Sequence, residues 1–144
     1  MHKLRILVAD DHGDMRWAAI RLLSEEFSVV GSAADGRNLI DAAITLMPDV
    51  IVSDVRMPQL TGPEAMKVLR ATGLNIPFVF MSTDVSNVEG CIEAGCMGFV
   101  HKLDIGYELV RAVSAASRRQ VYISREALTV EGVNCPSAAV CRFA

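Results

Sequence analysis

Residues 50–58, VIVSDVRMP, decide which fold this chain can adopt. The segment opens with an uninterrupted apolar run of strand length, and Asp54 stands where that run ends. A similar segment, ILVADD at residues 6–11, ends in the acidic pair Asp10 and Asp11. Continuous apolar runs are typical of parallel strands that are buried on both faces of a sheet. If the two strands are parallel neighbours, the three carboxylates meet at the carboxyl edge of the sheet, where open α/β folds keep their ligand sites.

Three clustered carboxylates have a chemical requirement. Like charges repel, so one of the groups would take up a proton unless a cation held all three ionised. A divalent metal ion that prefers oxygen ligands meets this requirement. We therefore expect a metal site made by Asp10, Asp11 and Asp54.

Apolar runs of strand length alternate with segments of helical period along the chain, which predicts a parallel sheet with crossover helices and hence an α/β fold. The expected strands lie near residues 4–9, 28–32, 50–53, 77–81 and 98–101. The expected helices lie near residues 14–26, 37–47, 63–72, 87–94 and 105–118. The sequence SNVE at residues 86–89 has the spacing of a capping box, and we expect it to start the fourth helix.

The length of 144 residues suits one domain with a substantial core. We expect that domain to cover residues 1–128. Residues 129–144 lack a clear period and are expected to form a loosely ordered tail. The tail holds Cys135 and Cys141, whose pairing would be disfavoured in a reducing compartment.

The composition excludes several classes of function. The net charge is −3, with 17 acidic and 14 basic residues well mixed, so no direct contact with nucleic acid is expected. No apolar run approaches the ~20 residues that a membrane-spanning helix needs, and no signal peptide follows Met1. We expect a cytoplasmic protein that does not enter the membrane.

Two further polar residues end predicted strands, Ser82 after the fourth and Lys102 after the fifth. Each has an ordinary explanation, as a turn residue or a solvated charge. Together with the three aspartates, however, they form a set in which every residue type is one that phosphoryl transfer to a carboxylate needs.

At this point residues 3–128 resemble the receiver domain of response regulators in bacterial two-component signalling. The resemblance rests on four blocks in order, which are VADDH at 8–12, DVRMP at 54–58 with Gly62 behind it, PFVFMS at 77–82 and AGCMGFVHK at 94–102. Residues 121–128, VYISREAL, resemble the linker toward a helix-turn-helix DNA-binding domain in one subfamily. The resemblance implies a flavodoxin-like, doubly wound sheet of five parallel strands in the order 2-1-3-4-5, with five helices.

The resemblance also implies a role for each site residue. Asp54 would be the phosphoacceptor, receiving a phosphoryl group from a sensor histidine kinase or a phosphotransfer protein. Asp10, Asp11 and Asp54, with the backbone carbonyl of Arg56, would bind Mg²⁺. Lys102 and Ser82 would contact the phosphoryl oxygens.

A switch is implied as well, in which the Ser82 hydroxyl moves toward the phosphoryl group and Phe99 fills the vacated space. The signal would leave through the surface of the fourth helix, the fifth strand and the fifth helix, where a phosphorylation-dependent homodimer could form. From the residues themselves we add the hypothesis that Arg56 and Asp84 face each other across the site mouth. An ion pair between them would hinder water from reaching the acyl phosphate.

Other interpretations stay open. The chain could be a binding module that works without phosphorylation, or the receiver part of a longer DNA-binding regulator. A Mg²⁺-dependent phosphohydrolase is disfavoured, because such enzymes typically place an aspartate two residues after the nucleophile and here that position is Arg56. We expect no enzymatic activity beyond the chain's own phosphorylation and dephosphorylation. His12 and His101 are expected to lie at the surface or beside the site without binding a metal.

Overall fold

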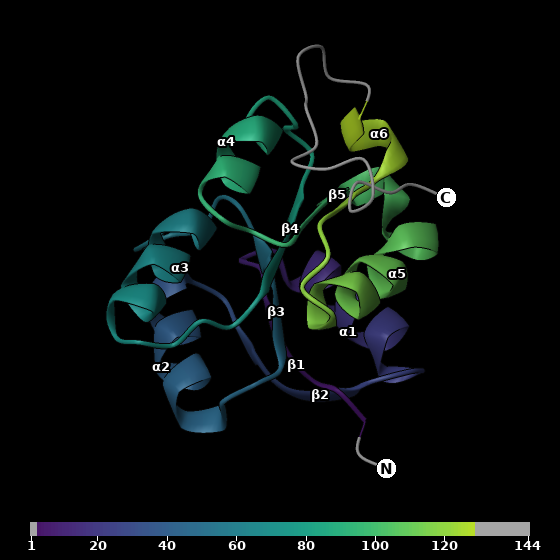
Figure 1. The fold of residues 1–144 in the computed structure, drawn as a ribbon. Helices are drawn as coiled ribbons and strands as arrows, with labels where there is room; N and C mark the ends of the chain where they lie inside the picture. The colour runs from purple at the N-terminus through teal and green to yellow at the C-terminus, as the bar shows by residue number, and fades with distance from the viewer. Residues whose placement is uncertain (1–2, 129–144) are drawn as a thin grey trace.

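The computed structural model describes residues 3–128 of the chain, and the expected tail with its two cysteines lies outside the described residues. The fold is one twisted parallel sheet with helices on both faces (Figure 1). Helices α2, α3 and α4 lie on one side of the sheet, and α1 and α5 lie on the other. None of the helices in residues 3–128 has the length and apolar character needed to cross a bilayer.

The sheet has the order β2-β1-β3-β4-β5-β6, and every neighbouring pair is parallel. The strands are β1 (Arg5–Ala9), β2 (Ser28–Ala33), β3 (Val50–Asp54), β4 (Phe78–Ser82), β5 (Gly98–His101) and β6 (Tyr122–Ile123). The helices are α1 (Gly13–Ser24), α2 (Gly36–Leu46), α3 (Gly62–Ala71), α4 (Val88–Glu93), α5 (Ile105–Ser117) and α6 (Arg125–Leu128), with a 3₁₀ turn, η1 (Lys102–Asp104), before α5.

The predicted doubly wound order 2-1-3-4-5 is confirmed, but the predicted count of five strands is wrong. Strand β6 pairs with β5, with Tyr122 beside Gly98 and Ile123 beside Phe99. Two residues are too few to show the two-residue period of a strand, so the segment gave no strand signal. The short helix α6 escaped prediction for the same reason.

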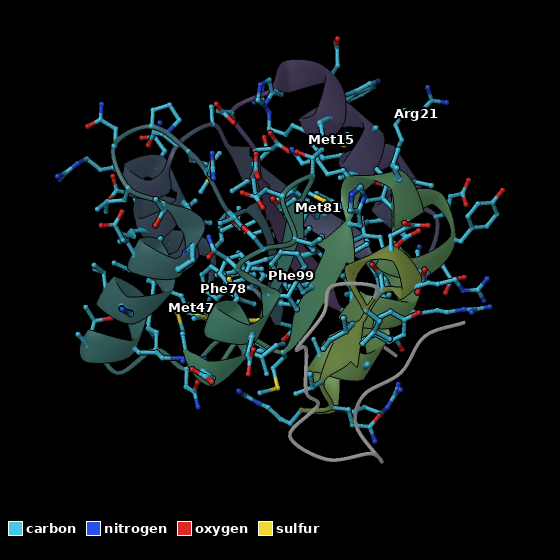
Figure 2. All side chains as sticks on the ribbon, turned by 90° about the horizontal axis from the view of Figure 1, so that it is seen from above. Met15, Arg21, Met47, Phe78, Met81 and Phe99 are labelled. Carbon is cyan, nitrogen blue, oxygen red and sulfur yellow. The ribbon has the colours of Figure 1, made fainter. Side chains whose placement is uncertain are left out.

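Both faces of the sheet are buried, which explains the continuous apolar runs in the sequence. All five residues of β3 and all five of β4 are buried. One apolar core lies under α2, α3 and α4, and a second lies under α1 and α5. Phe78 and Phe99 lie in the first core, whereas Arg21 points outward from α1 (Figure 2).

Helix α3 begins close to the end of β3 because of its capping and its first glycine. Thr61 and Glu64 form a complete capping box, and Pro63 occupies the first turn. Gly62 donates its backbone N–H to the carbonyl of Val55 at 2.9 Å. A Cβ at residue 62 would lie 2.5 Å from the carbonyl oxygen of Asp54, so only glycine allows this approach.

Helix α4 is the shortest of the crossover helices, with six residues, and its predicted capping box is wrong. Asn87 occupies the N-cap and its side chain makes no capping bond. Ser86 instead donates its hydroxyl to Asp84 at 2.6 Å in the preceding turn. The far end of α4 is held by Arg70 of α3, whose guanidinium donates to the carbonyls of Ala94 and Gly95 at 2.6 and 2.7 Å.

The last described segment, residues 121–128, is fastened to the β5–α5 region by polar contacts. The Glu108 carboxylate is buried and accepts from the Tyr122 hydroxyl at 2.9 Å and from the Arg125 backbone N–H at 3.2 Å. The backbone N–H of His101 donates to the Ser124 hydroxyl at 2.9 Å. Burial, together with Glu108, raises the pKa of Tyr122 to about 12.

We predict that Tyr122→Phe lowers the free energy of unfolding by about 1.5 kcal/mol, because it removes a buried hydrogen bond to a charged carboxylate. Urea denaturation of wild type and variant measures this loss. The matched control is Tyr107→Phe, which changes an exposed tyrosine on α5, the helix that carries Glu108, and should leave the free energy unchanged. Equal values for the two variants would contradict the anchoring role of Glu108.

Candidate functional site

Strands β1 and β3 are direct neighbours, with Ile6 beside Val50 and Ala9 beside Ser53. Asp10 therefore follows one strand at the same edge of the sheet where Asp54 ends the other. Asp10 and Asp54 are buried, while Asp11 is exposed. The three carboxylates converge as the sequence predicts, because oxygen atoms from all three lie within 4.8 Å of one another. A ring nitrogen of His12 belongs to the same group of atoms.

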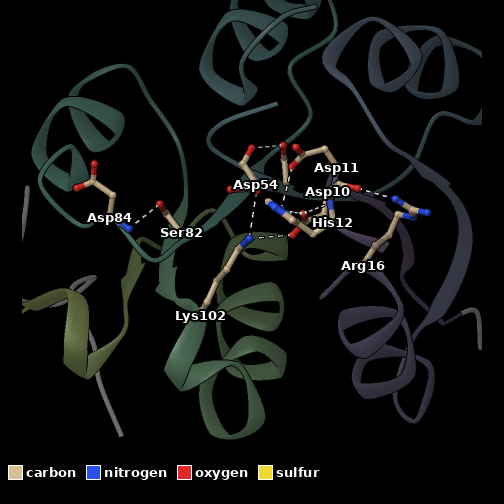
Figure 3. Close-up of polar contacts among 9 residues, drawn as sticks. Asp10, Asp11, His12, Arg16, Asp54, Ser82, Asp84 and Lys102 are labelled. Atoms are coloured by element: carbon tan, nitrogen blue, oxygen red, sulfur yellow. Dashed lines mark hydrogen bonds and ion pairs between the residues drawn. The ribbon is translucent and has the colours of Figure 1, made fainter. Parts of the chain in front are cut away.

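Lys102 reaches the same point from the end of β5. Its Nζ lies 3.1 Å from Oδ2 of Asp54 and 3.1 Å from Oδ2 of Asp10 (Figure 3). The Lys102 side chain is only 10% exposed, so this charge is largely removed from water. The ammonium thus bridges the two buried carboxylates.

Burial and the neighbouring charges shift the proton affinities in this cluster. Burial raises the pKa of the Asp54 carboxyl; the hydrogen bond and charge of Lys102 oppose that rise, and the charge of Asp10 adds to it. Burial alone would lower the pKa of Lys102, but the hydrogen bonds and charges of Asp54 and Asp10 outweigh it and raise the pKa. Lys102 is therefore held in its charged form, while the Asp54 carboxyl binds a proton more tightly than an exposed aspartate does.

The donor set fits a hard divalent cation. Three ionised carboxylates beside one ammonium leave two negative charges uncompensated, which is the charge that Mg²⁺ supplies. Carboxylate oxygens are also the ligands that Mg²⁺ prefers, and one exposed edge of the cluster leaves room for the waters that this ion keeps. Asp10, Asp11 and Asp54 are thus able to hold a magnesium ion.

Ser82 ends β4, the strand next to β3, and its side chain is turned away from the carboxylates. Its Oγ accepts a hydrogen bond from the backbone N–H of Asp84 at 3.0 Å (Figure 3). The register places Asp54 beside Met81, so Ser82 is one residue beyond the strand position opposite Asp54. The hydroxyl is therefore near the site but engaged with its own loop.

Arg56 and Asp84 form an ion pair at the surface, with Nη2 of Arg56 2.8 Å from Oδ2 of Asp84. The two residues come from the segments after β3 and β4, so the pair links the two loops beside Asp54. Hydrogen bonds from Ser86 hold the pKa of the Asp84 carboxyl below its ordinary value, and Arg56 lowers it further. Whether the pair acts as a gate stays a prediction.

Phe99 is fully buried in β5, where the strand register places it beside Phe80. Phe99 lies three residues before Lys102, which follows directly after the end of β5. The structure thus places Phe99 in the core below the site, and its role in a switch stays a prediction.

Two residues near the carboxylates were not assigned a role from the sequence. Arg16, one turn into α1, donates from Nη1 to the backbone carbonyl of Asp10 at 2.7 Å. His12 places Nδ1 3.2 Å from Oδ1 of Asp11. The backbone N–H of His12 also donates to Oδ1 of Asp10 at 2.9 Å. That last contact has a signal in the sequence, because an Asp side chain often binds the backbone two residues later.

Residues 6–114 match the family model of the response regulator receiver domain. The transcriptional regulatory protein DegU of Brevibacillus brevis is 30% identical over 126 residues, which are 85% of this chain and 53% of that protein. The uncharacterized transcriptional regulatory protein YxjL of Bacillus subtilis is 35% identical over 121 residues, covering 81% of this chain and 55% of that protein.

The chain is also similar to part of an enzyme and to a receiver domain whose structure has been solved. A protein-glutamate methylesterase/protein-glutamine glutaminase of a Nocardioides species is 36% identical over 85 residues, which are 58% of this chain and 23% of that enzyme. The signal receiver domain of NarL from Mycobacterium tuberculosis has a TM-score of 0.77 at 30% identity, covering 82% of this chain and 98% of that domain.

The chain spans about half the length of the two transcriptional regulators and about a quarter of the methylesterase. This chain belongs to the response regulator receiver domain family of two-component signalling.

Proposed function

We propose that this receiver accepts a phosphoryl group on Asp54 from the phosphohistidine of a sensor histidine kinase or of a phosphotransfer protein. The observation that carries the proposal is the position of the Lys102 ammonium, 3.1 Å from carboxylates of both Asp54 and Asp10 at a buried strand edge. A cation at that point can bind a phosphoryl oxygen once the group is attached to Asp54. The reaction is the chain's own modification and requires no further enzymatic activity from it.

In the transfer step, an Asp54 carboxylate oxygen forms a bond to phosphorus while the bond from phosphorus to the imidazole nitrogen breaks. The imidazole keeps the electron pair of the broken bond, and the product is an acyl phosphate on Asp54. No general base is required, because the attacking carboxylate carries no proton. The site contributes position and charge compensation, which dominate catalysis of phosphoryl transfer.

The carboxylates of Asp10, Asp11 and Asp54, with the backbone carbonyl of Arg56, would hold Mg²⁺. When bound, the ion supplies positive charge that keeps Asp54 ionised and offsets charge on the phosphoryl oxygens. Lys102 stays close to its present place, exchanging part of its contact with Asp54 for a phosphoryl oxygen. Asp10 remains its second partner throughout.

Phosphorylation changes the partner of Ser82. Its hydroxyl now accepts from Asp84 and would instead donate to a phosphoryl oxygen, drawing the loop of residues 83–87 toward the site. Hydrogen bonds to charged groups contribute about 1.5 to 3 kcal/mol, less than the ~5.5 kcal/mol needed to move a population from 1:99 to 99:1. Lys102 and the metal supply the rest, and Phe99 rotates into the space that Ser82 leaves.

The surface that changes consists of α4, β5 and α5. Helix α4 starts without a side-chain cap, while Arg70 holds its far end, so motion of the loop reaches the first turn most easily. A phosphorylation-dependent homodimer through this surface would carry the signal onward.

We place the receiver in residues 1–128 and in the cytoplasm, and we assign no contact with nucleic acid to this chain. In longer relatives, binding to DNA would belong to their remaining half.

The experiment that tests the proposal is intact-protein mass spectrometry after incubation with acetyl phosphate and Mg²⁺. We expect one added phosphoryl group on wild type and none on Asp54→Asn, which keeps the shape of the side chain but removes the nucleophile. An adduct on both proteins would place the acceptor elsewhere. No adduct on either protein, with Mg²⁺ bound, would favour a binding module that works without phosphorylation.

The ion pair of Arg56 and Asp84 yields a second prediction. We expect Asp84→Ala to shorten the lifetime of phospho-Asp54 about two- to fivefold, because exposed ion pairs contribute modestly and water gains access to the acyl phosphate. Loss of the phosphoryl mass with time measures the lifetime. Asp14→Ala, which removes an exposed carboxylate on α1, serves as the control. An unchanged lifetime in Asp84→Ala would remove the gate.

A further inference from the structure

His12 lies beside the carboxylate cluster, next to Asp11 and Asp10. Its Nδ1 is 3.2 Å from Oδ1 of Asp11 and 3.5 Å from Oδ1 of Asp10. Lys102, in contrast, contacts Oδ2 of Asp10 and Oδ2 of Asp54. The two oxygens of Asp10 thus face different groups, one the ammonium and the other the imidazole.

The backbone fixes the place of the imidazole. The N–H of His12 donates to Oδ1 of Asp10 at 2.9 Å, and its carbonyl accepts from the N–H of Arg16 at 2.9 Å. Arg16 also donates from Nη1 to the backbone carbonyl of Asp10. His12 stands at the N-cap of α1, but its side chain makes no capping bond. The hydrogen bonds of this turn therefore hold the imidazole beside the cluster, and the ring has no capping role in α1.

The spacing of these atoms suits a shared ion. Ligands on neighbouring corners of an octahedron at about 2.1 Å from the metal lie about 3 Å apart. The distance from Nδ1 of His12 to Oδ1 of Asp11 is close to that value. Ligand atoms from His12 and the three aspartates also all lie within 4.8 Å of one another, so one ion can reach all four residues after small adjustments.

We propose that His12 Nδ1 is a direct ligand of the metal ion in this site, and that the nitrogen makes the site take a divalent first-row transition-metal ion more tightly than Mg²⁺. Imidazole is a ligand of choice for nickel and zinc ions, whereas Mg²⁺ is served by oxygen alone. The inference rests on the metal site of the proposed function and departs from our expectation that His12 binds no metal. The side chain is 73% exposed, so it can adjust to the ion without disturbing the core.

The test is calorimetric titration of the full chain with Ni²⁺ and, separately, with Mg²⁺. We expect His12→Ala to weaken Ni²⁺ binding at least about tenfold, since even residues that only orient a ligand change metal affinity by that factor. Mg²⁺ affinity should change less than about twofold. Asp11→Asn should weaken both ions at this site and shows how much Ni²⁺ binds elsewhere on the chain.

His101→Ala is the matched control, because His101 ends β5 and its Nδ1 accepts from the backbone N–H of Leu103 at 3.0 Å. It should leave both titrations unchanged. Equal weakening of Ni²⁺ and Mg²⁺ in His12→Ala, or no weakening of Ni²⁺, would overturn the nitrogen ligand while leaving the Mg²⁺ site intact. A wild-type chain that binds neither ion would overturn the metal site itself.

Discussion

The structure depends on the ion pairs that Lys102 makes with Asp10 and Asp54. Two buried carboxylates a few ångströms apart are costly in any fold, because burial and mutual repulsion both disfavour their charged forms. The ammonium that follows β5 offsets part of that cost, and the charge still uncompensated is the charge that a divalent cation would offset. The buried charges therefore lower the stability of the fold at the sheet edge, and the same charges form a site that can receive a phosphoryl group.

The same segment that carries Lys102 also reaches the outer surface of the domain. Residues 101–108 include the site lysine, and the two ends of this stretch, His101 and Glu108, hold residues 122–125 against the edge of the sheet. On the other side, Ser82 is bonded to the loop that leads into α4. Under the proposed function, a change at Asp54 would have two short routes outward, one through the β4 loop and one along the β5–α5 connection.

Much of this arrangement could be predicted from the sequence, because its main signals are strong and local. Continuous apolar runs ending in Asp10 and Asp54 indicated buried parallel strands and a shared edge, and the resemblance supplied the strand order. The sixth strand could not be found, since Tyr122 and Ile123 pair through the backbone over only two residues. His12 lies at the surface beside the site, as expected, but its contacts with Asp10 and Asp11 depend on how the turn after β1 folds back and could not be predicted. The capping box predicted from SNVE at residues 86–89 was wrong, because the Ser86 hydroxyl donates to Asp84 instead.

The most direct test of the account is the free energy of unfolding of Lys102→Met, measured in urea without added metal and again with Mg²⁺. Removing one partner of a buried ion pair leaves uncompensated charge, so we expect a loss of about 3 kcal/mol without metal. Mg²⁺ should return part of that loss by binding the folded form. Lys67→Met, which removes an exposed lysine on α3, is the reference. A loss no larger than that of Lys67→Met would contradict the claim that Lys102 holds the carboxylate cluster together.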